Sequence, residues 1–204
     1  MLDKIARRMT PEEFYAWQEP MDEKYELVDG YPVPRCPDIE MMTGASRRHD
    51  QIVVNVLREL SNQLRGSACR PFTADTAVRT LPEVRRRPDA GVECGPLDDE
   101  SHEAGEVRLV IEVLSPSTRE FDVLGKLDEY KAIESVDHIL IVEPNEPKAM
   151  LWSRAADRSW QHAALEGLDA SIDVTSLGIA LELKELYAGL TFRPAPKLID
   201  GSER

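Results

Sequence analysis

The most restrictive feature of the sequence is a strand–helix–strand pattern in its second half. Residues 107–114 (VRLVIEVL) are apolar on both faces except at Glu112 and at Arg108 near the start, and residues 138–143 (HILIVE) form a second apolar run. Such runs are typical of strands that are covered on both faces. A helix is predicted over about 119–133 by apolar residues that recur every three positions, namely Phe121, Leu124, Leu127 and Tyr130. The two strands should therefore be parallel and joined by a right-handed crossover.

Local signals predict further elements on both sides of this unit. Thr10 and Glu13 form a capping box that starts a short helix through about Gln18. Asp29-Gly30 between apolar residues predicts a tight hairpin. An apolar stripe over about 47–64, followed by Gly66, predicts a long helix. The remaining expectations are strands at about 69–80 and 88–93, a hairpin over 147–165 and a helix at 181–190.

The length and the apolar runs set the class of protein. A chain of 204 residues fits one domain, expected over residues 10–190 with tails at 1–9 and 191–204. The longest apolar runs have the length of buried strands and are too short to cross a bilayer. The N-terminus lacks the apolar core of a secretory signal. These features predict a cytoplasmic protein without a membrane partner.

The charge is strongly negative but uneven along the chain. The formal net charge is −13, which argues against a general nucleic-acid coating protein. Residues 46–89, however, hold nine arginines, no lysine and five acidic residues. Guanidinium groups bind phosphate bidentately, so this segment predicts either a basic patch or an ordinary arginine-rich surface.

The cysteines and histidines show no pattern of a metal or disulfide framework. Cys36, Cys69 and Cys94 are odd in number and far apart, and no CxxC pair exists. They are expected to be buried or semi-buried free thiols in a reducing compartment. The four histidines also lack metal-ligand spacing.

Three polar residues are candidates for chemistry. Glu112 interrupts an apolar strand, where a carboxylate is costly unless it is paired or metal-bound, although a pair with Arg108 would also explain it. Asp89 follows Pro88 at the start of a strand, where a turn aspartate is the alternative. Lys126 shares a helix face with Asp122 and Tyr130, and an exposed ion pair is its alternative.

Together these three residues suit phosphodiester hydrolysis. Two carboxylates on adjacent strands can hold a hard divalent cation and leave water positions for a substrate phosphate. A nearby ammonium group can polarise the attacking water or offset charge in the transition state. No nucleophile elbow or glycine-rich phosphate loop offers a stronger scheme.

The motifs that carry these residues resemble the Uma-two family of restriction-endonuclease-like proteins. The similarity rests on Pro88-Asp89, then Glu112-Val113-Leu114-Ser115-Pro116-Ser117-Thr118 about twenty residues later, then Asp122, Lys126 and Tyr130. It extends to the YELVDG string at 25–30, to His49 and to the HILIVEP string at 138–144, and covers roughly residues 10–190.

The resemblance implies an α/β (α+β) restriction endonuclease-like PD-(D/E)XK fold, a central mixed β-sheet flanked by helices. It implies Asp89 and Glu112 as ligands of Mg²⁺ (or Mn²⁺). Four further residues would be auxiliary metal ligands or would contact the ligands rather than the metal: Glu26, His49, Asp122 and Tyr130. Leu114 stands where the superfamily motif has lysine, so Lys126 would supply that function from the following helix.

The expected activity is that of a metal-dependent endonuclease acting on DNA, with Asp89, Glu112 and Lys126 as catalytic residues. A DNA backbone would be guided by Arg85, Arg86 and Arg87, and a homodimer is expected by analogy with nucleases of this type. Two alternatives stay open: a catalytically silent nuclease-fold module acting in binding or assembly, and a small-molecule hydrolase with the same metal site.

Overall fold

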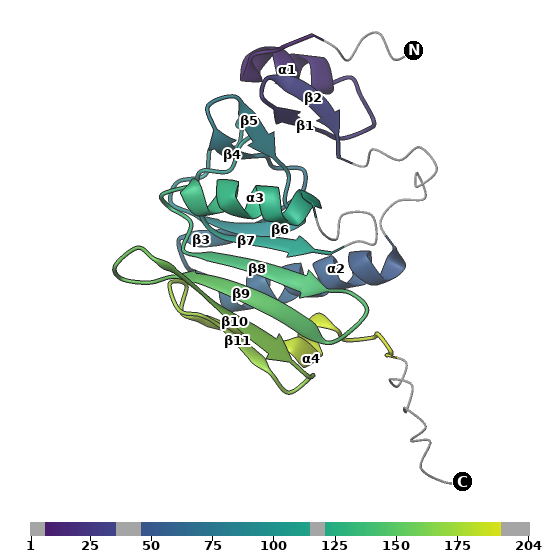
Figure 1. Ribbon diagram of the computed structural model, residues 1–204, viewed down its shortest axis with the longest axis vertical. Coiled ribbons are helices and arrows are strands. Elements are labelled where there is room, and N and C mark those ends of the chain that lie inside the picture. Colours follow the sequence, from purple (N-terminus) through teal and green to yellow (C-terminus); the bar gives the residue numbers. More distant parts are fainter. Residues whose placement is uncertain (1–6, 36–45, 115–120, 193–204) are drawn as a thin grey trace, which may run out of the picture.

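A six-stranded mixed sheet forms the centre of the molecule (Figure 1). The computed structural model describes residues 7–35, 46–114 and 121–192, without the side chains of 121–124. The strand order is β10-β9-β8-β7-β6-β3. Their bounds are β3 Cys69–Thr73, β6 Ala90–Cys94, β7 Glu106–Val113, β8 His138–Glu143, β9 Lys148–Arg154 and β10 Trp160–Glu166. The β7 and β8 strands are parallel and the other pairs antiparallel, and α3 (Phe121–Ala132) joins β7 to β8, so the predicted strand–helix–strand unit is confirmed.

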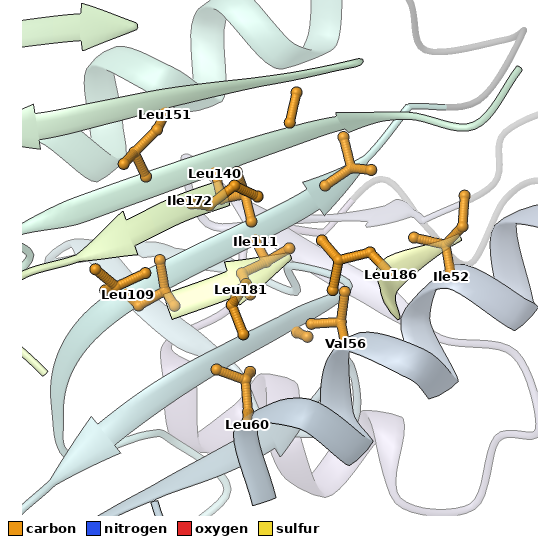
Figure 2. Close-up of a cluster of buried hydrophobic side chains, with 14 of the residues drawn as sticks. Ile52, Val56, Leu60, Leu109, Ile111, Leu140, Leu151, Ile172, Leu181 and Leu186 are labelled. Carbon is orange, nitrogen blue, oxygen red and sulfur yellow. The ribbon is translucent and has the colours of Figure 1, made fainter. Parts of the chain in front are cut away.

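Helices cover both faces of this sheet. The α2 helix (Arg47–Gln63) lies on one face with β11 (Ser171–Val174), β12 (Ile179–Glu182) and α4 (Leu183–Leu186), while α3 lies on the other (Figure 1). Figure 2 shows the larger core, in which the apolar stripe of α2 meets the sheet and the β11–β12 hairpin through Ile52, Val56, Leu60, Leu109, Ile111, Leu140, Leu151, Ile172, Leu181 and Leu186. Burying such side chains stabilises the fold by about 1.5–3 kcal/mol each relative to exposure.

A second, smaller sheet has the strand order β2-β1-β5-β4. Its strands are β1 Tyr25–Val28, β2 Tyr31–Pro34, β4 Val78–Leu81 and β5 Val84–Arg86, and α1 (Pro11–Gln18) lies beside it (Figure 1). The Asp29-Gly30 turn is confirmed: both residues have positive φ, 51° and 82°, as the tight hairpin turn requires. The predicted capping box of Thr10 and Glu13 is also present.

Two regions differ from the expected elements. The region around Pro82 contains four strands divided between the two sheets, because β5 pairs with β1, and β4 pairs with β5, rather than with the central sheet. The helix expected at 181–190 is shorter and follows a strand. Residues 179–182 alternate buried and exposed, so they pair with β11 and leave only Leu183–Leu186 as helix.

The expectation of free thiols is wrong for two cysteines. Cys69 and Cys94 face each other in the antiparallel β3–β6 pair and form a disulfide across 25 residues of sequence. Strand register brings these side chains together, and sequence spacing alone does not reveal that register. Cys36 lies outside the described residues.

No helix in the described part of the chain is long and apolar enough to cross a membrane.

A substitution at Gly91 would test the packing of the central sheet against β3. A Cβ there would lie 2.3 Å from Cζ of Phe72 and 2.8 Å from the carbonyl oxygen of Leu109. We expect Gly91→Ala to lower the free energy of unfolding by about 1–3 kcal/mol in urea titrations, because backbone must shift to make room.

The matched control is Gly125→Ala in α3, where an added Cβ meets no atom of another described segment within 4 Å. It should raise stability by up to about 1 kcal/mol, since alanine favours helix. Equal effects of the two substitutions would contradict the packing described for β6.

Candidate active site

Two acidic side chains meet near the end of β7, on the side of the sheet that α3 covers. Val110 belongs to the apolar cluster beneath α3, and the strand period of two places Glu112 on the same face. Asp89 directly precedes β6, and its Oδ2 accepts a hydrogen bond from the backbone N–H of Val113, at 2.7 Å. The β6–β7 pairing therefore brings together the two carboxylates that sequence analysis selected.

Asp89 is buried and held by three donors. Arg35 donates to Oδ1 at 2.6 Å, and His49 lies 3.2 Å from Oδ2, which also accepts the Val113 N–H. Burial by itself would raise the pKa of Asp89, but the hydrogen bond and charge of His49, with the charge of Arg35, lower it. Burial lowers the pKa of His49, but its hydrogen bond to Asp89 and the charge of Asp89 raise it. The pKa of His49 is higher than usual as a result. Asp89 is therefore an ionised carboxylate.

Lys126 points into the site from α3. Lys126 is only 8 % exposed, and its Nζ lies 3.2 Å from Oε1 of Glu26, a buried residue of β1. The alternative of an exposed surface ion pair is therefore wrong for Lys126. Tyr130, one turn further along α3, donates its hydroxyl to Oε1 of Glu112 at 2.8 Å. The side chain of Asp122 lies outside the described part of the structure, as do residues Ser115–Thr118.

Glu112 has the opposite protonation tendency to Asp89. Desolvation, together with the negative charge of Asp89, raises the pKa of Glu112 to about 8, although Lys126 and the Tyr130 hydroxyl act in the other direction. Arg108 does not neutralise Glu112, because this arginine pairs with Asp137 at 2.6 Å and with Glu106 at 3.0 Å. Neighbouring carboxyls with separated pKa values are typical of catalytic sites.

The arginines at 85–87 do not form an open phosphate-binding surface, which corrects the expectation for this segment. Arg85 and Arg87 are each 4 % exposed. Arg85 binds Glu103 and nearby carbonyl oxygens, and Arg87 binds the carbonyl oxygens of Tyr25, Ala74 and Asp75. Arg86 pairs with Glu26 and Glu129. All three guanidinium groups therefore bind internal acceptors.

Sequence analysis missed Arg35 and the Glu129 carboxylate. Arg35 is 54 residues from Asp89 in sequence, and Glu129 is 43 residues from its partner Arg86. No local pattern signals pairs at such separations. Glu129 could have been noticed because it is three residues from Lys126 on the same helix, where i and i+3 side chains share a face.

The mixed sheet, the flanking helices and the acid–acid–lysine site define a restriction endonuclease-like fold. In agreement, the sequence matches the Uma2 (Uma-two) family, described as "Putative restriction endonuclease", over residues 11–184, and the chain belongs to this family.

Relatives and a solved structure extend the comparison. The uncharacterised Synechocystis proteins slr1290 and sll1609 are 29 % and 25 % identical, over 91 % and 88 % of this chain and 94 % and 99 % of their own. The crystal structure of "a putative nuclease belonging to DUF820" from Anabaena variabilis superposes with a TM-score of 0.64. It is 17 % identical, covering 88 % of this chain and 97 % of that one, and shows the shared fold.

The raised pKa of Glu112 predicts a pH-dependent stability of the metal-free protein. Between its ordinary value of 4.5 and about 8, the folded state holds a proton that the unfolded state has released. Stability should therefore fall as pH rises through this window. Thermal unfolding in a chelator from pH 5 to 8 should show a smaller fall in Glu112→Gln than in wild type.

Glu106→Gln is the control, because it removes an exposed carboxylate from the same strand. A wild-type slope identical to that of Glu112→Gln would show that Glu112 does not titrate differently in the two states.

Proposed function

We propose that this protein is a metal-dependent endonuclease that hydrolyses phosphodiester bonds in DNA, using Mg²⁺ or Mn²⁺. The observation that supports it best is the meeting of Asp89, Glu112 and the buried Lys126 at one end of the central sheet. Membership of a restriction-endonuclease-like family supports the same reaction class.

The donor set fits a hard divalent cation. Asp89 and Glu112 offer carboxylate oxygens, and mutual repulsion is one cause of the raised pKa of Glu112. A cation between them would remove that repulsion and release the proton. Within the described residues no group of three or more His, Cys, Asp or Glu side chains is arranged to hold a metal ion by itself. Waters and a substrate phosphate would complete the coordination, as is usual for Mg²⁺.

Each side chain has a distinct part in the hydrolysis. A bound cation would act as a Lewis acid and lower the pKa of the attacking water. Asp89, fixed by His49 and the Val113 N–H, and Glu112, oriented by Tyr130, would hold it. Lys126 would offset the negative charge that grows on the phosphate oxygens. The water oxygen would bond to phosphorus as the P–O bond on the opposite side breaks, with one proton of that water passing to solvent and the leaving oxygen taking up a proton from solvent.

A second candidate is a catalytically silent nuclease-fold module that acts in binding or assembly. Two observations favour it: Asp89 already carries an arginine partner, and the protein has a net charge of −13, which opposes the approach of DNA. Metal binding separates the two candidates, since the silent module has no need of a cation.

Calorimetry with Mg²⁺ and Mn²⁺ is the direct test of the metal site. We expect the wild type to bind one cation, with protons released, and Glu112→Ala to lose at least about tenfold in affinity. Glu106→Ala is the matched control from the same strand and should bind as the wild type does. A wild type that fails to bind at millimolar metal, with or without an added oligonucleotide, would favour the silent module.

Cleavage of plasmid DNA tests the roles of the three residues. Asp89→Ala and Glu112→Ala should abolish measurable cleavage, because the cation is lost. Lys126→Met should lower the rate constant by about 10²–10³-fold while metal affinity is largely kept, because it removes charge stabilisation in the transition state.

Lys131→Met is the control for Lys126, because Lys131 lies on the same helix and packs over Trp152 outside the site. It should cleave at the wild-type rate. If Asp89→Ala and Glu112→Ala retained activity in a folded protein, the assignment of the site would be wrong.

A further inference from the structure

Arg35 closes the site on the side that faces solvent. It directly follows β2, and its backbone N–H donates to the carbonyl oxygen of Lys24 at 3.0 Å, which anchors its Cα. Its side chain is 27 % exposed, whereas the side chain of its partner Asp89 is 8 % exposed. The guanidinium group therefore lies between a buried carboxylate and the surrounding water.

Arg35 already binds the oxygen of Asp89 that a cation would need as a ligand. Oδ2 of Asp89 already contacts the Val113 N–H and the His49 ring, at 2.7 and 3.2 Å. Oδ1 has Arg35 as its partner, at 2.6 Å. A divalent ion at Oδ1 would stand within a few ångströms of a guanidinium that carries like charge, which is strongly unfavourable in a partly buried site. Arg35 and a metal ion therefore compete for Asp89.

A displaced Arg35 would remain tethered at the mouth of the site. A guanidinium group suits a phosphate, because its N–H groups form a fork that binds two oxygens at once. The neighbouring arginines are already engaged: Arg86 with Glu26 and Glu129, and Arg87 with backbone carbonyl oxygens. Among these three, Arg35 alone pairs with one of the two carboxylates proposed to hold the cation, Asp89 and Glu112.

We propose that Arg35 is a substrate-binding residue that exchanges partners: it pairs with Asp89 in the metal-free protein and with a phosphate of the nucleic acid once a cation occupies the site. The exchange rests on the proposed metal site. This exchange makes metal and phosphate bind cooperatively. The cation takes Asp89 from Arg35, and the phosphate then provides Arg35 with a new anionic partner.

Two opposite effects of one substitution test this exchange. Without nucleic acid, Arg35→Ala should bind Mn²⁺ about threefold to tenfold more tightly than wild type in calorimetry, because a competing cation is gone. With Ca²⁺ in place of Mg²⁺, to permit binding with little cleavage, Arg35→Ala should bind an oligonucleotide duplex about tenfold more weakly in fluorescence anisotropy. Arg35→Lys keeps the positive charge but lacks the forked guanidinium group. Its affinities for Mn²⁺ and for the duplex should lie between those of wild type and Arg35→Ala.

Arg65→Ala is the matched control. Arg65 is an exposed arginine just beyond the far end of α2, about 24 Å from His49 at 1.5 Å per residue, well over a Debye length. It should leave metal affinity unchanged. Thermal unfolding of each variant in the absence of metal shows whether an effect reflects loss of folding.

The outcomes separate this inference from the proposed function. Metal affinity that is equal or weaker in a folded Arg35→Ala, with wild type binding metal, overturns the exchange and leaves the nuclease assignment intact. Metal binding by Arg35→Ala and not by wild type supports the exchange in its strongest form. Absence of metal binding in both proteins overturns the metal site and the exchange together.

Discussion

The guanidinium group of Arg86 joins the parts of the molecule that build the site. It donates to both carboxylate oxygens of Glu129 on α3, at 2.8 and 2.5 Å, and to Glu26 on β1, at 3.1 Å. Glu26 in turn pairs with Lys126. One side chain of β5 thus ties the small sheet to the helix that carries the lysine. Removing one member of such a buried ionic network leaves its partners unpaired, which is usually more costly than the net contribution of the pair.

The same network places cations beside the acids of the candidate site in a protein that is acidic as a whole. The acids Glu26, Asp89 and Glu112 lie among the cations Arg35, Arg86 and Lys126. Close pairs inside the protein are screened less by salt than exposed charges are. The potential near Asp89 and Glu112 therefore depends on these close pairs as well as on the net charge.

Sequence reasoning worked where the signal is local. The strands around Glu112 and Ile139 and the Asp29-Gly30 hairpin follow from periodicity and turn chemistry, and the structure confirms them. The face of Glu112 was also predictable, because a strand alternates with a period of two.

Nonlocal pairings escaped the same reasoning. The Cys69–Cys94 bond depends on the register of β3 and β6, and the division of 69–94 between two sheets depends on β1. The inward direction of Arg85 and Arg87 and the Arg35–Asp89 contact depend on how these sheets meet. An arginine-rich sequence shows that a segment is positively charged. Tertiary packing determines whether its side chains face solvent or a buried acceptor.

The division of the site between sheet and helix gives it two levels of order. The carboxylates belong to the central sheet, whose backbone hydrogen bonds and core on the α2 face are independent of α3. Lys126 and Tyr130 are held by the contacts of a single helix with β1, β5 and the sheet below. Segments with few anchoring contacts open at lower free energy than core strands do. A transient undocking of α3 would therefore produce a species that retains both carboxylates proposed to bind metal but lacks the ammonium group, so that the proposed metal binding and the proposed turnover would depend on different folding units.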